Sequence, residues 1–192
     1  MADPLPKLFG SSARVKLLRL FLFNPRHSFT LPEAAQRSRT TSREARREVA
    51  LFVETKLAKR TSRGKGIRYT LNDEFKYLSA MQQLLLNAPE RADEIRERLR
   101  RTGAIKLIVL SGIFAGEWDS ALDILVVGDR VKERILRERV RRLESEIGRE
   151  LRYTLLASEN FLYRLNMNDK LTRDVFDYPH IIILDKFNIG LK

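Results

Sequence analysis

Three arginines, Arg43, Arg46 and Arg47, recur at the spacing of one helix face and are the residues whose types best fit binding chemistry. A guanidinium group is planar, always charged, and presents a fork of hydrogen-bond donors. That fork fits the O6 and N7 acceptors of guanine, or the oxygens of a phosphate. We therefore expect these arginines, with Thr41 and Ser42 just before them, to bind DNA.

The residues around these arginines predict two helices joined by a tight turn. Thr30-Leu31-Pro32-Glu33 and Thr41-Ser42-Arg43-Glu44 both match a capping box, in which threonine caps the helix and glutamate closes the cap three residues later. We expect a short helix over residues 31–37, a turn over 38–40 and a longer helix over 42–56. The apolar face of the longer helix lies opposite the arginines and comprises Ala45, Val49, Phe52, Val53 and Leu57. This pattern is typical of a helix-turn-helix, whose second helix enters the major groove.

Residues 57–72 predict a basic β-hairpin directly after the longer helix. Ile67, Tyr69 and Leu71 alternate with polar residues, and Gly64 and Gly66 permit a tight turn. Four side chains of this hairpin could reach phosphates or a minor groove: Arg60, Arg63, Lys65 and Arg68. A hairpin in this place is typical of the wing of a winged helix-turn-helix. The alternative is that Arg43, Arg46 and Arg47 form only a solvated helix face.

The charge balance also favours a polyanionic partner. Residues 1–75 hold 16 Lys or Arg against seven Asp or Glu, so they carry +9 of the formal net charge of +12. The chain has no cysteine, and its two histidines, His27 and His180, lack companion ligands. No apolar run approaches the roughly 20 residues that span a bilayer. We expect a cytoplasmic protein that associates with DNA, with no membrane partner and no cofactor.

The other periodic segments predict an α+β fold. Helices are expected over residues 12–23, 74–87, 92–101 and 131–147, and Ser158 is expected to cap one more. Strands are expected over residues 105–110, 122–127, 151–157 and 181–184. The predicted domains are a winged helix-turn-helix over residues 1–75 and a small α/β domain with a mixed sheet over 102–192. Residues 76–101 are a helical linker or a dimerisation segment, although helix 74–87 could equally pack on its own domain.

The run from Leu110 to Asp129 resembles the signature of the minimal nucleotidyltransferase family. That signature has a Gly-Ser pair, an Ala-x-Gly stretch and a Ser-Asp-x-Asp motif that opens an apolar strand. Residues 8–18, 148–154 and 159–161 are likewise similar to winged-helix regulators fused to such domains. The resemblance implies a nucleotidyltransferase-like fold for residues 102–192. In the family, two carboxylates on alternate strand positions hold the Mg²⁺ that neutralises a nucleoside triphosphate.

This sequence departs from the family pattern at the residues that carry the chemistry. Ala121 occupies the position of the first carboxylate, and Ile113 replaces the serine that follows Gly112. Asp123 remains, but residues 151–157 supply no further carboxylate. We therefore expect a degenerate nucleotide site at Gly112, Ile113, Ala121 and Asp123, with no metal and no catalytic residue. Such a domain could still bind a nucleotide or a protein ligand, or mediate dimerisation.

These patterns together predict a homodimeric regulator of transcription that binds double-stranded DNA. Its second domain is expected to be a pseudoenzyme used for oligomerisation or ligand sensing. Two alternatives remain: an active Mg-dependent nucleotidyltransferase of the toxin–antitoxin type, and an architectural chromatin protein.

Overall fold

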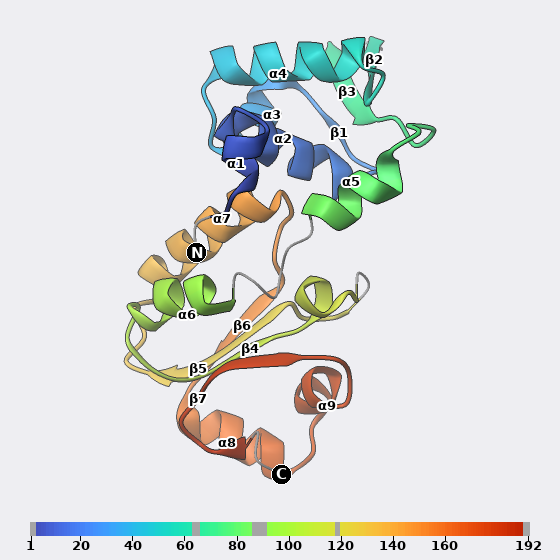
Figure 1. The fold of residues 1–192 in the computed structure, drawn as a ribbon. Coiled ribbons are helices and arrows are strands. Elements are labelled where there is room, and N and C mark those ends of the chain that lie inside the picture. Colours follow the sequence, from blue (N-terminus) through green and yellow to red (C-terminus); the bar gives the residue numbers. More distant parts are fainter. Residues whose placement is uncertain (1–2, 63–65, 86–91, 118–119, 190–192) are drawn as a thin grey trace. The chain divides into compact units, whose positions relative to one another are not determined.

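The computed structural model describes residues 3–62, 66–85, 92–117 and 120–189, and its chain divides into two compact units (Figure 1). The N-terminal unit contains residues 2–87 together with residues 142–150. The C-terminal unit contains residues 88–141 and 151–192. Each unit has its own sheet, so each is described by itself.

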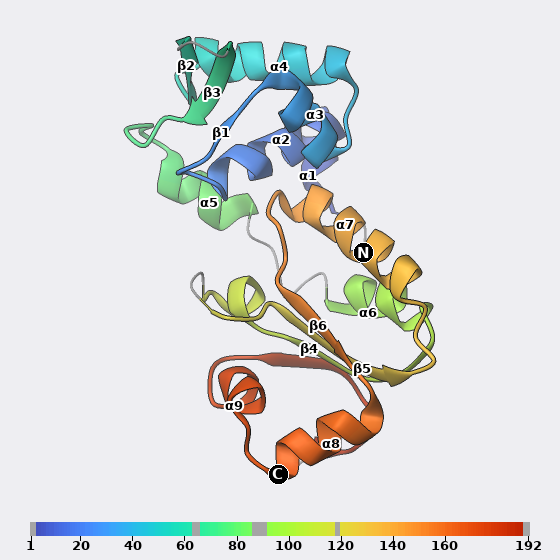
Figure 2. The same cartoon turned by 180° about the vertical axis from the view of Figure 1, so that it is seen from behind.

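The N-terminal unit is mainly helical and carries a small antiparallel sheet of strand order β1-β3-β2 (Figure 2). Both capping boxes are confirmed, and so are the helices predicted over residues 12–23, 31–37 and 42–56 to within two residues, the turn and the hairpin. The helix predicted over residues 74–87 begins only at Leu78, and residues 86 and 87 lie outside the described chain. The short strand β1 was not predicted, because two residues carry no recognisable alternation. The elements are α1 (Leu5–Leu8), α2 (Ser12–Leu22), β1 (Ser28–Phe29), α3 (Leu31–Ser38), α4 (Ser42–Glu54), β2 (Ala58–Ser62), β3 (Ile67–Leu71) and α5 (Leu78–Leu85).

Helix α2 is the centre of this unit's core. Its side chains from Leu17 to Leu22 are all buried, so the helix is covered on every side. Phe21 makes edge-on contacts with Phe29 of β1 and Phe52 of α4, with ring centroids 5.5 and 5.9 Å apart. These contacts fix α4 against α2 and leave the other side of α4 to solvent.

Residues 142–150, which fall within the predicted 102–192 segment, contact residues 2–87. They comprise the end of helix α7 (Glu133–Ile147) and the turn after it. Gly148 has φ +83°, and a Cβ at this position would lie 2.3 Å from the carbonyl carbon of Arg19. Only glycine fits such an approach of two backbones. Asn24 Nδ2 donates to the Gly148 carbonyl at 2.6 Å, and Arg37 pairs with Glu150 at 2.9 Å.

The C-terminal unit is built on a four-stranded sheet of order β6-β5-β4-β7. Strands β5 and β6 are parallel and the other pairs are antiparallel, so the predicted small mixed sheet and the α+β class are confirmed. Leu107, Val109, Leu125 and Val127 pack against α8 and α9 through Phe161 and Val175. Besides α7, the elements are α6 (Ala92–Arg100), β4 (Ala104–Leu110), a 3₁₀ turn (Gly112–Ala115), β5 (Ile124–Asp129), β6 (Tyr153–Leu156), α8 (Ser158–Asn166), α9 (Lys170–Phe176) and β7 (Ile181–Asp185).

Two details of this unit differ from the sequence-based expectations. Ser158 does not cap α8: the N-cap is Ala157, without a side-chain cap, and Ser158 is the first helical residue. The Ser158 hydroxyl donates instead to Asp129 Oδ2 at 2.7 Å. Helix α9 was not predicted, because its seven residues are too few to show a clear period. None of the helices in the described ranges is long and apolar enough to cross a membrane.

Asp129, at the end of β5, ties β4 to the start of α8. Its carboxylate accepts hydrogen bonds from Lys106 Nζ at 2.9 Å and from the Ser158 hydroxyl and amide. The hydrogen bond from Lys106, followed by those from Ser158, lowers the pKa of Asp129 from 3.8 to about 2. The ionised carboxylate is therefore a stabilising element of this unit.

We expect Asp129→Asn to reduce the acid sensitivity of the C-terminal unit. Because the pKa is lower in the folded state, the contribution of Asp129 is fully present above about pH 4 and is lost as the pH falls towards about 2. The asparagine variant should therefore show a smaller decline in unfolding free energy between these pH values, measured by urea titration. Asp177→Asn is the control, since Asp177 is exposed and makes no ion pair with any described residue. An equal decline in the parent protein and the Asp129 variant would contradict the assignment.

Candidate nucleic-acid interface

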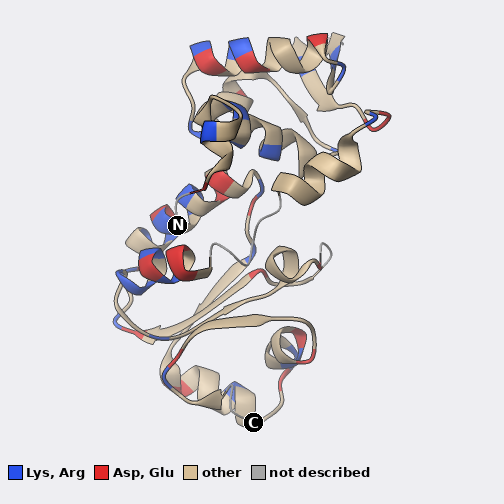
Figure 3. Ribbon diagram, viewed as in Figure 1, with Lys and Arg blue, Asp and Glu red and all other residues tan. Residues whose placement is uncertain are grey.

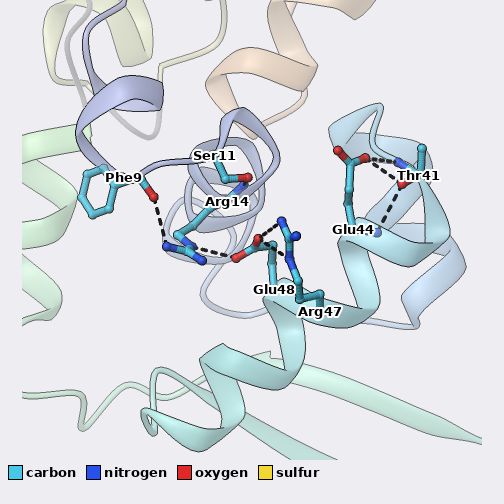
Figure 4. A network of polar contacts seen from close by, with 7 residues as sticks. All are labelled: Phe9, Ser11, Arg14, Thr41, Glu44, Arg47 and Glu48. Carbon is cyan, nitrogen blue, oxygen red and sulfur yellow. Dashed lines mark hydrogen bonds and ion pairs between the residues drawn. The ribbon is translucent and has the colours of Figure 1, made fainter.

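The start of α4 is held by a complete capping box. The Thr41 amide donates to Glu44 Oε2 at 2.8 Å, and the Glu44 amide donates to Thr41 Oγ1 at 3.2 Å (Figure 4). The hydrogen bond from the Thr41 amide is the main cause that lowers the pKa of Glu44. The Thr41 hydroxyl also donates to Glu44 at 2.7 Å, so its proton is engaged in the cap. Thr41 therefore positions the helix start, and of the two residues before the arginines only Ser42 keeps a hydroxyl free of the cap.

The outward face of α4 is basic in its first turns. Ser42, Arg43, Arg46, Arg47 and Ala50 are all exposed, whereas the opposite residues Ala45, Val49 and Phe52 are buried. Lys and Arg mark the same first turns in Figure 3. Arg43 and Arg46 make no ion pair with any residue that the structure describes. Both guanidinium groups are therefore available to an incoming acceptor.

Arg47 differs from its neighbours because it is bound to a buried carboxylate. Its Nε and Nη2 donate to Glu48 Oε1 at 3.0 and 2.7 Å, and Arg14 Nε donates to Glu48 Oε2 at 2.7 Å (Figure 4). Glu48 is completely buried. Burial raises the pKa of Glu48, but the hydrogen bonds from Arg14 and Arg47 outweigh it, so the pKa lies below its usual value. The pair of Arg14 with Glu48 therefore links α2 to α4. Arg47, which shares the same carboxylate, is less free than Arg43 or Arg46 to bind a partner.

Two of the predicted hairpin cations lie in the described chain, and they differ in their contacts. One is exposed to solvent, and the other is bonded to residues of its own unit. Arg60 on β2 is exposed. Arg68 on β3 is half-buried and turns towards β1, where it donates to the Ser28 hydroxyl at 2.7 Å and the Ser28 carbonyl at 2.6 Å. It also pairs with Glu33 of α3 at 3.0 Å. Arg63 and Lys65 lie outside the described residues.

In the C-terminal unit, three residues of the predicted nucleotide site meet around one carboxylate. Asp123 is completely buried, and its Oδ1 accepts the Ile113 amide at 3.2 Å. Gly112 has φ +55°, and a Cβ at this position would lie 2.3 Å from Asp123 Oδ1. Only glycine therefore allows the turn to close on the carboxylate. Ala121 is exposed.

Arg152, just before β6, occupies the remaining sites of the Asp123 carboxylate. Its amide and Nε donate to Oδ2 at 2.8 and 2.9 Å, and its Nη2 donates to Oδ1 at 2.9 Å. A metal ion at Asp123 would have to displace this bidentate arginine. Across the described residues, no group of three His, Asp or Glu side chains is placed to hold a metal ion. No local pattern could predict the role of Arg152, because it lies 29 positions from Asp123 in the chain.

A pocket of about 360 Å³ opens beside this site. It is lined by Ser111, Gly112, Glu117, Ser120, Ala121, Lys170, Asp174, Tyr178 and Pro179. Its charged residues are Glu117, Asp174 and Lys170, and the last two belong to α9. Such a volume falls within the range of small-molecule sites.

Searches with protein-family models, among curated proteins and among solved structures found no match to this chain.

Proposed function

We propose that this chain is a DNA-binding regulator of transcription whose N-terminal unit is a winged helix-turn-helix. In this proposal α3 and α4 are the two helices of the motif, α4 enters the major groove, and β2 with β3 forms the wing. The observation that carries the proposal is the exposed basic start of α4, where Arg43 and Arg46 have no internal acceptor in the described chain. Because α4 is capped and packed on α2, these side chains project from a rigid element.

The arginines of this surface have different roles in the proposal. Arg43 and Arg46 read base edges, since they are free to make paired hydrogen bonds. Arg47 supports the surface through Glu48, and Arg60 contacts the phosphate backbone. Arg68 holds β3 against β1 and α3, which orients the wing without contacting DNA.

The C-terminal unit is, in the same proposal, a nucleotidyltransferase-like domain without catalytic activity. The engagement of Asp123 by Arg152 supports this, because the last carboxylate of the family pattern is then closed to metal ions. The pocket beside Gly112 and Ala121 supports a role in sensing a small ligand. Homodimerisation completes the proposal, since a dimer would present two copies of α4 to a symmetric site.

The proposal predicts that Arg43→Ala and Arg46→Ala relax sequence preference. Duplexes bound by the parent protein are first selected from a random pool, and affinities are then compared for the selected sequence and single-base changes. Each variant should lose discrimination of about 5- to 150-fold at one base position, since a bidentate arginine contributes about 1–3 kcal/mol. Lys59→Ala is the control, because Lys59 is already paired with Asp73 at 3.0 Å.

Equal affinity of the parent protein for every duplex, unaffected by either arginine variant, would contradict sequence-specific binding. It would favour the architectural alternative. Two half-sites one helical turn apart in the selected duplexes would support the dimer.

A further inference from the structure

Helix α7 carries a second stripe of unpaired arginines, on the C-terminal unit. Arg134, Arg137 and Arg141 stand at positions i, i+3 and i+7, so they share one face of the helix. All three are exposed. The opposite face is buried through Leu136, Val140, Leu143 and Ile147. The stripe spans about 10 Å along the helix axis.

The arginines of this stripe are not neutralised by their own helix. None of the three makes an ion pair with a described residue, whereas Glu138, which lies beside them, is engaged elsewhere. Helix α6 of the same unit provides an internal comparison. There Arg96 pairs with Asp93, Arg98 with Glu94, and both Arg100 and Arg101 with Glu97. The arginines in and directly after α6 therefore pair with carboxylates of that helix, whereas the arginines of the α7 stripe pair with no described carboxylate.

We propose that this stripe is a second contact surface for the phosphate backbone of double-stranded DNA. That the partner is DNA rests on the proposed function. That it is a polyanion with phosphate groups follows from the exposed guanidinium groups of the stripe. A duplex carries one charge per about 1.7 Å, so a stripe of about 10 Å faces about six phosphate charges. Guanidinium groups bind phosphate oxygens in bidentate geometry. A membrane surface fits less well, because an interfacial helix needs an exposed apolar face and that of α7 is buried.

The test compares two triple variants of the full chain. The first is Arg134→Gln with Arg137→Gln and Arg141→Gln, which removes the stripe. The second is Arg96→Gln with Arg100→Gln and Arg101→Gln, which removes the same formal charge from α6. The measured quantity is the slope of log affinity against log salt concentration, on a random-sequence duplex of about four helical turns. Each phosphate contact adds about 0.9 to this slope, so the stripe variant should lose about 2.7 and the α6 variant less than about 0.9.

Equal loss in both variants would overturn the proposal, because only the net charge of the protein would then matter. No loss in the stripe variant would overturn it as well. Tighter, stripe-dependent binding to double-stranded RNA than to DNA would assign the surface to another partner. Failure of the proposed function is distinguishable, since it appears as equal affinity of the parent protein for selected and scrambled duplexes. A stripe-dependent slope can persist in that case.

Discussion

Replacing Asp123 by alanine is expected to lower the unfolding free energy of the C-terminal unit by about 1–3 kcal/mol, because buried donors then lose their acceptor. The carboxylate is completely buried and accepts hydrogen bonds from the Ile113 amide and from the amide and guanidinium of Arg152. Alanine removes this acceptor from the Ile113 amide and from the Arg152 amide, and it removes the ion pair between the Arg152 guanidinium and Asp123. The measurement is amide hydrogen exchange of β5, which reports opening of this unit separately from the other.

The double variant Asp123→Ala with Arg152→Met is the informative control. It removes both charges, so it should recover part of the stability that the single variant loses. Asp123→Asn keeps one acceptor oxygen and should fall between the parent protein and alanine. A loss below about 1 kcal/mol in the alanine variant would show that the pair does not hold the turn at Gly112 to β5.

Replacing Arg19 by methionine is expected to lower the unfolding free energy of the N-terminal unit by about 3 kcal/mol, because the largely buried Asp3 carboxylate then loses this counter-charge. The Arg19 side chain is only 3% exposed. Its Nη1 pairs with Asp3 at 2.9 Å and donates to the Glu146 carbonyl at 3.1 Å, while Nε donates to the Leu85 carbonyl at 3.1 Å. The Glu146 carbonyl lies in the last turn of α7, and Leu85 is the last described residue of α5.

Replacing Arg19 should also increase local opening at the end of α7, in addition to lowering the stability of the whole unit. Hydrogen exchange of the amides from Leu143 to Ile147 should accelerate more than that of β4, because Arg19 binds the end of α7 directly. Arg19→Lys keeps the charge but not the fork, so an intermediate loss is expected. Uniform acceleration over the whole chain would contradict a local role for Arg19.

The sequence predicted those elements whose signals are local. Thr30, Glu33, Thr41 and Glu44 each lie within one turn of the partners that complete their caps, so the capping boxes could be read directly. The hairpin followed from alternation around Gly64 and Gly66 in the same way. Helix α9 carried one usable signal that was missed, since Asp169 accepts hydrogen bonds from the first amides of that helix.

The parts that could not be predicted depend on residues far apart in the chain. Glu48 looks like one more surface glutamate on a charged helix, and one of the two arginines that compensate its burial, Arg14, lies 34 positions earlier. Arg47 accordingly looked like a third reader of DNA rather than a partner of Glu48. Arg152 gave no sign that it would occupy Asp123, because the distance between them is closed only when β6 pairs with β5.

The assignment of residues 142–150 to the N-terminal unit has a consequence for synthesis of the protein. Residues 2–87 leave the ribosome first, but Arg19, Asn24 and Gly148 meet only after the later segment has emerged. At about 5–20 residues per second, the 54 residues between positions 87 and 142 delay completion by roughly 3–11 seconds. During that interval the N-terminal unit of the nascent chain is incomplete, because Arg19 cannot yet donate its hydrogen bond to the Glu146 carbonyl. Nascent-chain proteolysis should therefore detect protection of residues 2–87 only after position 150 has left the exit tunnel.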